Sequence, residues 1–213
     1  MPPGRRLDHG QRHQRGRRRR GLGITGVTIE AARRALRAYR PTAIAIEPGM
    51  IPAAVAVVLR EGGDGLETLF IHRAERAGDT WSGQIAFPGG RKESADADLR
   101  ATAIRETREE IGVDLATAEL LAVLDDMYPR TPVLPPVVVR PFVFALPDRV
   151  PLPTLALSAE VQDAFWVSFR VLAAHHRGAS RAFPAYVVGQ HTIWGMTERI
   201  LTPLLTIVSQ SQS

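Results

Sequence analysis

Three glutamates in the middle of the chain have the spacing of a single helical turn. Glu106, Glu109 and Glu110 stand at positions i, i+3 and i+4, so a helix would carry all three on one face. Carboxylates that close repel one another unless a positive charge lies among them. A divalent cation with oxygen ligands, Mg²⁺ or Mn²⁺, would supply that charge and could carry a water that attacks phosphorus. The alternative is a solvated helix face whose glutamates pair with Arg105 and Arg108.

The residues around the glutamates predict the helix that would carry them. Residues 94–98 are rich in the serine and aspartate types that favour a helix N-terminus. Apolar residues then recur at helical spacing, and Gly112 predicts the C-cap. Before the helix, residues 84–87 have the character of a short strand, which the turn Pro88-Gly89-Gly90 would end.

The whole stretch 83–115 resembles the Nudix box, the signature of the Nudix hydrolases. That signature has a glycine, then a glutamate at a fixed spacing, and then the sequence R-E-apolar-x-E-E-x-G-apolar. Here the second half is RETREEIGV from Arg105, with Thr107 at the apolar position. The first half is one residue longer than the general pattern, with Asp96 near the expected glutamate. This longer spacing resembles the coenzyme A pyrophosphatase branch, as do the lead-in GQIAFPGG and the segment IWGMT from Ile193.

The resemblance implies a role for each polar residue of the box. The metal ligands would be three carboxylates and one backbone carbonyl, those of Glu106, Glu109, Glu110 and Gly90. Glu106 could instead be the base that activates water, and the sequence does not separate these two roles. Arg105 resembles the residue that holds a metal-binding glutamate in place, and Asp96 would pair with an arginine of the helix.

Residues outside the box are candidates for contacts with substrate. The loop 72–81 lies over the substrate in the resemblance, so Arg73 and Arg76 could meet phosphate oxygens. The coenzyme A branch usually has a histidine where this chain has Trp81. That tryptophan is either part of the core or a stacking platform for an adenine ring.

Two further charged residues have open assignments. Arg130 follows the box in a loop and is either a phosphate contact or a surface arginine. Glu160 precedes a predicted strand and either completes the metal site, acts as the base, or is an edge glutamate without a role.

The composition excludes several classes of protein. The chain has no cysteine, which rules out disulfides, zinc–thiolate sites and thiol nucleophiles. Its longest apolar runs are too short to span a bilayer, so we expect a cytoplasmic enzyme with no membrane partner. The net charge is +5, but residues 1–20 carry eight arginines and one aspartate, so the rest is slightly acidic. Without interleaved aromatics, this tail does not indicate a nucleic-acid partner.

The remaining elements are predicted from periodicity and turn residues. Pro141 argues for an edge or a bulge in its strand, Pro203 would kink the last helix or delay its start, and the resemblance places Trp194 near the active site. The predicted elements are a helix at 28–39, strands at 53–59 and 68–72 joined by a glycine-rich hairpin, strands at 118–125, 137–146 and 164–168, a helix at 169–176, a hairpin at 183–194 and a helix at 195–208.

This pattern predicts a mixed α/β fold, which the resemblance makes the Nudix α/β/α sandwich with a mixed sheet. The expected organisation is a disordered Arg-rich tail (1–24), an N-terminal helix and linker (25–46), the Nudix domain (47–208) and a frayed end (209–213). A homodimer is compatible with it.

The resemblance implies a Mg²⁺- or Mn²⁺-dependent pyrophosphohydrolase acting on a small diphosphate. The expected substrate is coenzyme A or acyl-coenzyme A, split into adenosine 3′,5′-bisphosphate and a phosphopantetheine. Two alternatives stay open: a hydrolase of nucleoside diphosphate derivatives or oxidised nucleotides, and a Nudix domain that senses a nucleotide without cleaving it.

Overall fold

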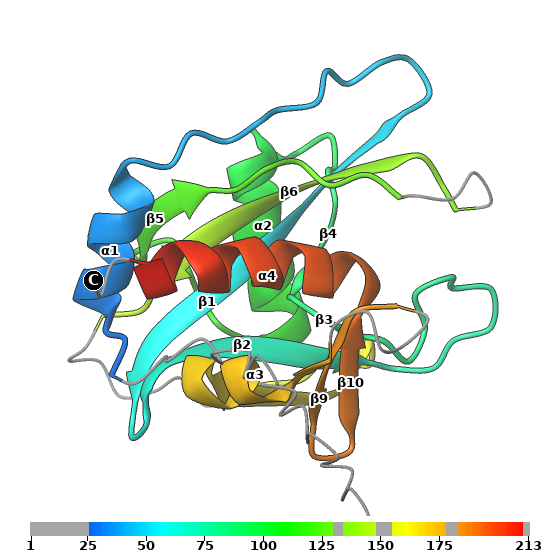
Figure 1. Ribbon diagram of the computed structural model, residues 1–213. Coiled ribbons are helices and arrows are strands. Elements are labelled where there is room, and N and C mark those ends of the chain that lie inside the picture. The colour runs from blue at the N-terminus through cyan, green and yellow to red at the C-terminus, as the bar shows by residue number, and fades with distance from the viewer. Residues whose placement is uncertain (1–25, 130–133, 148–154, 178–182, 211–213) are drawn as a thin grey trace, which may run out of the picture.

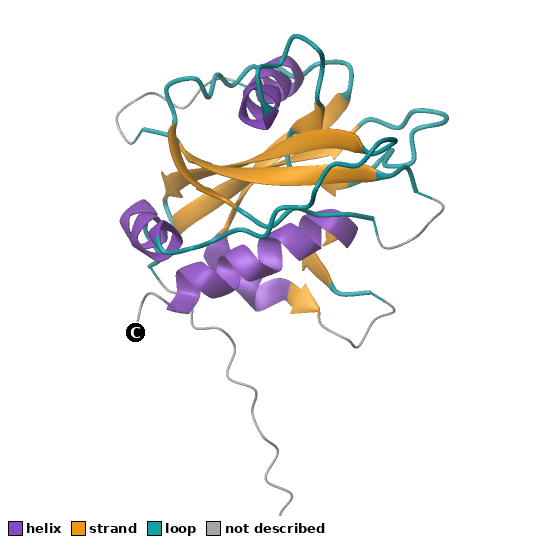
Figure 2. Ribbon diagram, turned by 90° about the horizontal axis from the view of Figure 1, so that it is seen from above, coloured by secondary structure: helices purple, strands orange, loops and turns teal. Residues whose placement is uncertain are grey.

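The computed structural model describes residues 26–129, 134–147, 155–177 and 183–210. In this part of the chain a seven-stranded mixed sheet lies between helices (Figures 1 and 2). The predicted α/β class with a mixed sheet is therefore confirmed. Arg130, the Arg-rich tail and residues 211–213 lie outside the described residues.

The large sheet is built on a long hairpin. Its strands are β1 (Ile51–Gly62), β2 (Gly65–Arg73), β3 (Ile85–Ala86), β4 (Gly89–Arg91), β5 (Glu119–Val123), β6 (Val137–Ala145) and β7 (Val161–Ser168). The path β3-β2-β1-β6-β5 is extended by β4 on β1 and by β7 on β2. β1 and β6 are parallel, and the other pairs are antiparallel.

The hairpin strands β1 and β2 stay paired only near their turn. Their register runs from Gly62↔Gly65 to Leu59↔Thr68. Beyond that point β1 pairs with β4 through residues 53–55, and β2 pairs with β3 through residues 71–72. The two short strands therefore fill the place where the long hairpin opens. The predicted strand at 84–87 is real but only two residues long.

Helices cover both faces of the sheet. Along β1, Val57 and Leu59 belong to one buried cluster with α1 (Ile29–Arg37), α3 (Phe169–His175) and α4 (Gly195–Gln210). Ala56 and Val58, whose side chains point the other way, belong to a second cluster with α2 (Leu99–Ile111). A small sheet of β8 (His176–Arg177), β9 (Ala185–Val188) and β10 (His191–Trp194) adjoins α3 and leads into α4.

The helix boundaries follow from local side-chain chemistry. The Thr28 hydroxyl accepts a hydrogen bond from the Ala31 amide at the start of α1. Asp98 accepts one from Ala101 at the start of α2, and Gly112 ends α2 with φ of 74° in the left-handed region. The predicted helices at 28–39 and at the box are thus confirmed, as are the N-cap within 94–98 and the C-cap at Gly112.

Pro141 was expected at an edge or a bulge: it does not lie at an edge, but the pairing of β6 shifts beside it, where Val123↔Phe142 is followed by the bridge Met127↔Val139. β6 lies between β1 and β5, and Pro141 pairs in register with Val55. The Pro141 carbonyl accepts from Leu124, just after β5 has ended at Val123. A strand residue directs its N and O to the same side. The N–H that Pro141 lacks would therefore point beyond the end of β5, where no β5 residue requires it as a donor.

The C-terminal helix is longer than predicted. α4 begins at Gly195, contains Pro203 without interruption, and continues through Gln210. Residues 209 and 210 are therefore helical, which corrects the predicted frayed end. Among the described residues no helix is both long and apolar enough to cross a membrane.

Candidate active site

The site is built where β4 meets α2. The amide of Gly89 donates a hydrogen bond of 2.9 Å to Glu110 Oε2. A side-chain carbon added to Gly90 would lie 2.3 Å from Glu106 Oε1, so the glycine leaves the space that this carboxylate occupies. The glycine pair and two of the three predicted carboxylates are therefore in direct contact.

The third carboxylate lies further out. The side chain of Glu109 is 53% exposed, and its Oε2 lies 2.9 Å from Arg105 Nη1. Glu106 Oε1 lies 3.1 Å from the same nitrogen. Among the residues that the structure describes, no three histidine or acidic side chains converge as a ready-made metal cluster. Glu109 would therefore have to turn from Arg105 to join a cation with the other two.

Arg105 is held from the opposite side by Asp96. The guanidinium donates to Asp96 through Nε at 2.9 Å and Nη2 at 3.0 Å. Asp96 also accepts from the Glu93 amide and the Thr102 hydroxyl. These hydrogen bonds, led by that from Arg105, hold the pKa of Asp96 well below its usual range. The predicted pairing of Asp96 with an arginine of the helix is confirmed.

Burial changes the acidity of the two inner carboxyl groups. It raises the pKa of Glu110 to about 8, although the Gly89 amide and Arg73 act in the opposite direction. It also raises the pKa of Glu106, against the effect of Arg105. Positive charge brought next to a buried carboxyl group stabilises its ionised form. The carboxyl groups of Glu106 and Glu110 both lie beside the glycine backbone, which leaves space for them. Their oxygens are hard donors that fit Mg²⁺ or Mn²⁺.

The loop between β2 and β3 places charged residues beside this site. Arg73 Nη1 lies 3.7 Å from Glu110 Oε1, and its Nη2 lies 2.7 Å from Asp79 Oδ2. The other oxygen of Asp79 accepts from the Trp81 amide at 3.0 Å. Burial by itself would raise the pKa of Asp79, but these two hydrogen bonds lower it below its ordinary value.

The structure places Arg76 and Glu160 together. Arg76 Nη1 lies 2.7 Å from Glu160 Oε1, and both side chains are about half exposed. The charge of Glu160 contributes to the raised pKa of Glu106 and of Glu110. Glu160 therefore lies close enough to act on the site, and the ion pair holds the β2–β3 loop to the start of β7.

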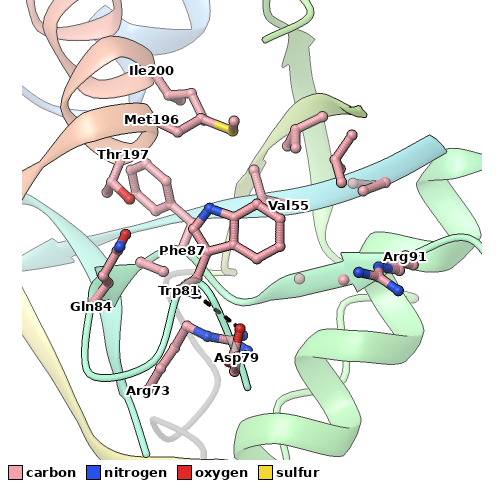
Figure 3. Close-up of a pocket in the computed structure, with 17 residues that line it drawn as sticks. Val55, Arg73, Asp79, Trp81, Gln84, Phe87, Arg91, Met196, Thr197 and Ile200 are labelled. Carbon is pink, nitrogen blue, oxygen red and sulfur yellow. Dashed lines mark hydrogen bonds and ion pairs between the residues drawn. The ribbon is translucent and has the colours of Figure 1, made fainter. Parts of the chain in front are cut away.

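A cavity of about 280 Å³ opens on the other side of the glycine pair (Figure 3). Trp81 lies among the residues that line it, with Met196 of α4 above it and Phe87 beside it. We call it the Trp81 cavity; its lining is mostly apolar, with polar groups at its ends, and comprises Ala53, Ala54, Val55, Arg73, Asp79, Trp81, Gln84, Ala86, Phe87, Gly89, Gly90, Arg91, Val137, Val139, Met196, Thr197 and Ile200. Trp81 is partly buried and packs on the edge of an apolar cluster, so it is both a wall of the cavity and a part of the packing.

Trp194 does not reach this cavity, which corrects the expectation drawn from the resemblance. Its side chain is exposed and pairs with Phe183 at 6.5 Å between ring centroids. The residues that follow it, Met196 and Thr197, line the cavity instead. A strand alternates its faces, and the turn into α4 at Gly195 directs the next side chains inward.

Sequence reasoning missed Gln84 and the part played by Asp79. Gln84 belongs to the lead-in GQIAFPGG, but that segment does not reveal that its side chain lines a cavity, because six helices and strands and the loops between them assemble the cavity. Asp79 did carry a local signal: an aspartate two residues before an amide is the pattern of an Asx turn. Its second bond, to Arg73, depends on the return of the loop to β2.

Comparison with known proteins shows which family the chain is similar to. Residues 50–186 match the NUDIX domain. Nudix hydrolase 22, chloroplastic, of Arabidopsis thaliana is 31% identical over 173 residues, which cover 74% of this chain. The chain spans only 55% of the length of that plant protein.

Two other relatives match a similar part of the chain. The mitochondrial coenzyme A diphosphatase NUDT8 of Mus musculus is 29% identical, over 74% of this chain and 79% of its own length. The Nudix hydrolase NudL of Photorhabdus laumondii is 31% identical, over 64% of this chain and 75% of its own length.

A solved structure agrees with the fold. The NUDIX domain of Shewanella oneidensis NrtR, complexed with ADP ribose, superposes with a TM-score of 0.52 at 15% identity, over 84% of this chain and 97% of that domain. At this identity the likeness shows the fold alone. The domain match confirms the resemblance of the sequence: the chain belongs to the Nudix family.

Proposed function

We propose that the protein is a Mg²⁺- or Mn²⁺-dependent pyrophosphohydrolase that cleaves the diphosphate bridge of coenzyme A or acyl-coenzyme A. The products would be adenosine 3′,5′-bisphosphate and a phosphopantetheine. The observation that carries the proposal is the contact of the glycine pair Gly89-Gly90 with Glu106 and Glu110, two carboxyl groups that burial makes poor anions unless positive charge is nearby.

Each residue of the site would have a separate task. Glu106, Glu109, Glu110 and the Gly90 carbonyl would hold the cation. When bound, the cation supplies charge to the phosphate oxygens and acidifies a coordinated water. Arg105, fixed by Asp96, would position Glu106. Either Glu106 or Glu160 would accept the proton of the attacking water.

The loop arginines would orient the substrate. Arg73 lies between Glu110 and Asp79, and its Nε has no hydrogen-bond partner among the described residues. Arg76 is half exposed on the same loop. Guanidinium groups so placed can contact the non-bridging oxygens of a diphosphate. Both arginines would therefore hold the bridge over the carboxylates.

The substrate class is supported by sequence rather than by geometry. The lead-in GQIAFPGG and the long spacing of the box resemble the coenzyme A branch. The mouse relative is described as a coenzyme A diphosphatase. These points favour coenzyme A over other diphosphates.

One observation favours a second candidate. Trp81 stands where the coenzyme A branch usually has histidine, and it forms a wall of the cavity beside the site. An aromatic wall suits the base of any nucleotide. The second candidate therefore keeps the metal site and cleaves nucleoside diphosphate derivatives or oxidised nucleotides.

The test is a substrate panel with Mg²⁺ or Mn²⁺. It would contain coenzyme A, acetyl-coenzyme A, ADP-ribose, a dinucleoside polyphosphate and 8-oxo-dGTP, with products resolved by chromatography. Adenosine 3′,5′-bisphosphate from the coenzyme A samples alone is the expected result. Cleavage of the other compounds with coenzyme A intact would contradict the substrate and support the second candidate.

Variants of the carboxylates test the chemistry. Glu109→Gln and Glu110→Gln should each lower kcat by about 100-fold or more while the fold is kept, since each removes a charge from the proposed ligand set. Glu47→Gln is the matched control, because Glu47 is exposed in the segment between α1 and β1. A parent protein that binds nucleotides but cleaves none of them with either metal would indicate a sensor instead.

A further inference from the structure

The Trp81 cavity has the size of one ring system rather than of a whole coenzyme. Its volume is about 280 Å³, just below the range of about 300–1,000 Å³ that is usual for sites of drug-sized ligands. Its middle is apolar, with Val139, Met196 and Ile200 among the lining side chains. One compact, largely apolar group of a substrate would fill it.

The polar groups in the cavity indicate what kind of ring this is. Gln84 lines the cavity (Figure 3), and its side-chain amide has no hydrogen-bond partner among the described residues. A glutamine amide offers a donor and an acceptor side by side, a pattern that matches the N6 and N7 edge of adenine. The Trp81 indole offers a flat face on which a base can stack. An aliphatic group would use neither feature.

The position of the cavity limits how the ring is joined to the reacting phosphates. Gly89 and Gly90 line the cavity, and the same two residues contact Glu110 and Glu106. A single backbone strand thus separates the cavity from the carboxylates. The base of an adenosine diphosphate unit is a few bonds from the phosphates and can reach. The thioester end of acyl-coenzyme A is far along the flexible pantetheine chain, so more rotatable bonds would have to be ordered to place it there.

Trp81 is held in place by the charged groups of the site. Asp79 binds the Trp81 amide with one oxygen and Arg73 with the other, and Arg73 faces Glu110. The Trp81 carbonyl accepts a hydrogen bond from the backbone amide of Gln84 at 3.3 Å. The backbone positions from which the Trp81 and Gln84 side chains project are therefore fixed relative to each other and to the carboxylate that would face the diphosphate.

We propose that the Trp81 cavity binds the adenine base of the substrate, with Trp81 stacking on the ring and Gln84 reading its edge. This inference rests on the proposed function for the identity of the substrate. Asp79 is a positioning residue that fixes the angle of Trp81. The pantetheine half of coenzyme A leaves the site on the other side of the diphosphate.

Binding of products separates this inference from the proposed hydrolysis, because it needs no turnover. Adenosine 3′,5′-bisphosphate, ribose 5-phosphate and 4′-phosphopantetheine would be titrated calorimetrically into the full-length protein in the presence of a chelator. The nucleotide should bind, and Trp81→Leu should raise its dissociation constant roughly tenfold or more, as expected for a lost stacking platform. Trp81→Phe should restore most of the affinity.

Matched controls make the result specific. Trp194→Leu, at an exposed tryptophan outside the cavity, should leave the dissociation constant unchanged. Gln84→Leu should remove the preference for adenosine over N6,N6-dimethyladenosine nucleotides. Thermal melts would show that each variant is folded.

Two outcomes would overturn the inference. Phosphopantetheine binding that depends on Trp81 would assign the cavity to the other half of the substrate. Unchanged nucleotide affinity in both Trp81→Leu and Gln84→Leu would place the base elsewhere. Failure of the substrate panel would remove the hydrolase proposal while leaving these binding results intact.

Discussion

Gly90 matters for the space it leaves. A methyl group at this position would fall 2.3 Å from Glu106 Oε1, so Gly90→Ala should push the carboxylate aside. Misplacement of a catalytic group by about 1 Å can cost roughly 100-fold in rate. We expect Gly90→Ala to lower kcat by at least tenfold with a small change in melting temperature, measured by steady-state kinetics and calorimetry.

Gly63→Ala is the control for this change. Gly63 lies in the β1–β2 turn, and a side-chain carbon there would meet nothing within 4 Å. Its kcat should equal that of the parent. Full activity in Gly90→Ala would show that the position of Glu106 is not critical to the reaction.

The contribution of Asp96 to the free energy of unfolding should depend on pH. Its pKa is held below the ordinary value mainly by the hydrogen bond from Arg105. A carboxyl group whose pKa is depressed by folding stabilises the native state above the unfolded pKa of about 3.9, and this contribution is lost as the pH falls further. Asp96→Asn should therefore destabilise the protein at pH 7, and the difference from the parent should shrink below about pH 4.

Urea denaturation at several pH values between 3 and 7 would measure this difference. Breaking a buried charge pair from one side typically costs about 3–5 kcal/mol, so the effect at pH 7 should be large. The matched variant is Asp163→Asn, at an exposed aspartate, which should change the free energy of unfolding little. A constant difference between Asp96→Asn and the parent across the pH range would contradict the account.

At the scale of elements, α2 depends on the residue that caps its N-terminus. Asp98 accepts a hydrogen bond from the Ala101 amide at 2.7 Å. Loss of such a cap costs about 1 kcal/mol, which for a chain of this size is about 2–4 °C in melting temperature. We expect Asp98→Ala to show this decrease by calorimetry and Asp98→Asn to restore most of it. Equal melting temperatures for Asp98→Ala and the parent would mean that solvent replaces the cap.

These caps explain why the helices could be predicted from the sequence. Thr28, Asp98 and Gly112 act on neighbours a few residues away, so their signals are local and readable. For Pro141 the sequence left an edge and a bulge open, because the choice depends on where β5 ends, more than a dozen residues earlier. Long-range packing decided that position.

The candidate site likewise has one part that could be predicted from the sequence and one part that could not. The carboxylates and Gly90 could be predicted, because they belong to one continuous motif. The Trp81 cavity could not, since β1, β4, β6, α4 and the β2–β3 loop each supply part of its wall. Gln84 and Met196 have no pattern in the sequence that marks them as neighbours.

At the scale of the whole molecule, a bound cation should stabilise the fold. A ligand at 100 times its dissociation constant adds about 2.7 kcal/mol to the free energy of unfolding, or roughly 5–10 °C in melting temperature for this size. We expect Mn²⁺ or Mg²⁺ to produce such a shift in scanning fluorimetry. A chelator should reverse it.

The inner carboxylates should be responsible for that shift. The double variant Glu106→Gln, Glu110→Gln should lose it, whereas Glu47→Gln should keep it. Potassium chloride at the same ionic strength controls for screening. An equal shift in the double variant would place the cation elsewhere on the protein.

The β2–β3 loop has a consequence for how this enzyme could change over time. Residues 74–84 leave the sheet and return to it at one point, where the Arg73 amide donates to the Gln84 carbonyl at 3.0 Å. We therefore expect that the length and composition of this segment can be changed while the strand register and α2 stay as they are. A library that randomises residues 77–82 but keeps Asp79 should yield members with new substrate preferences and an unaltered requirement for metal.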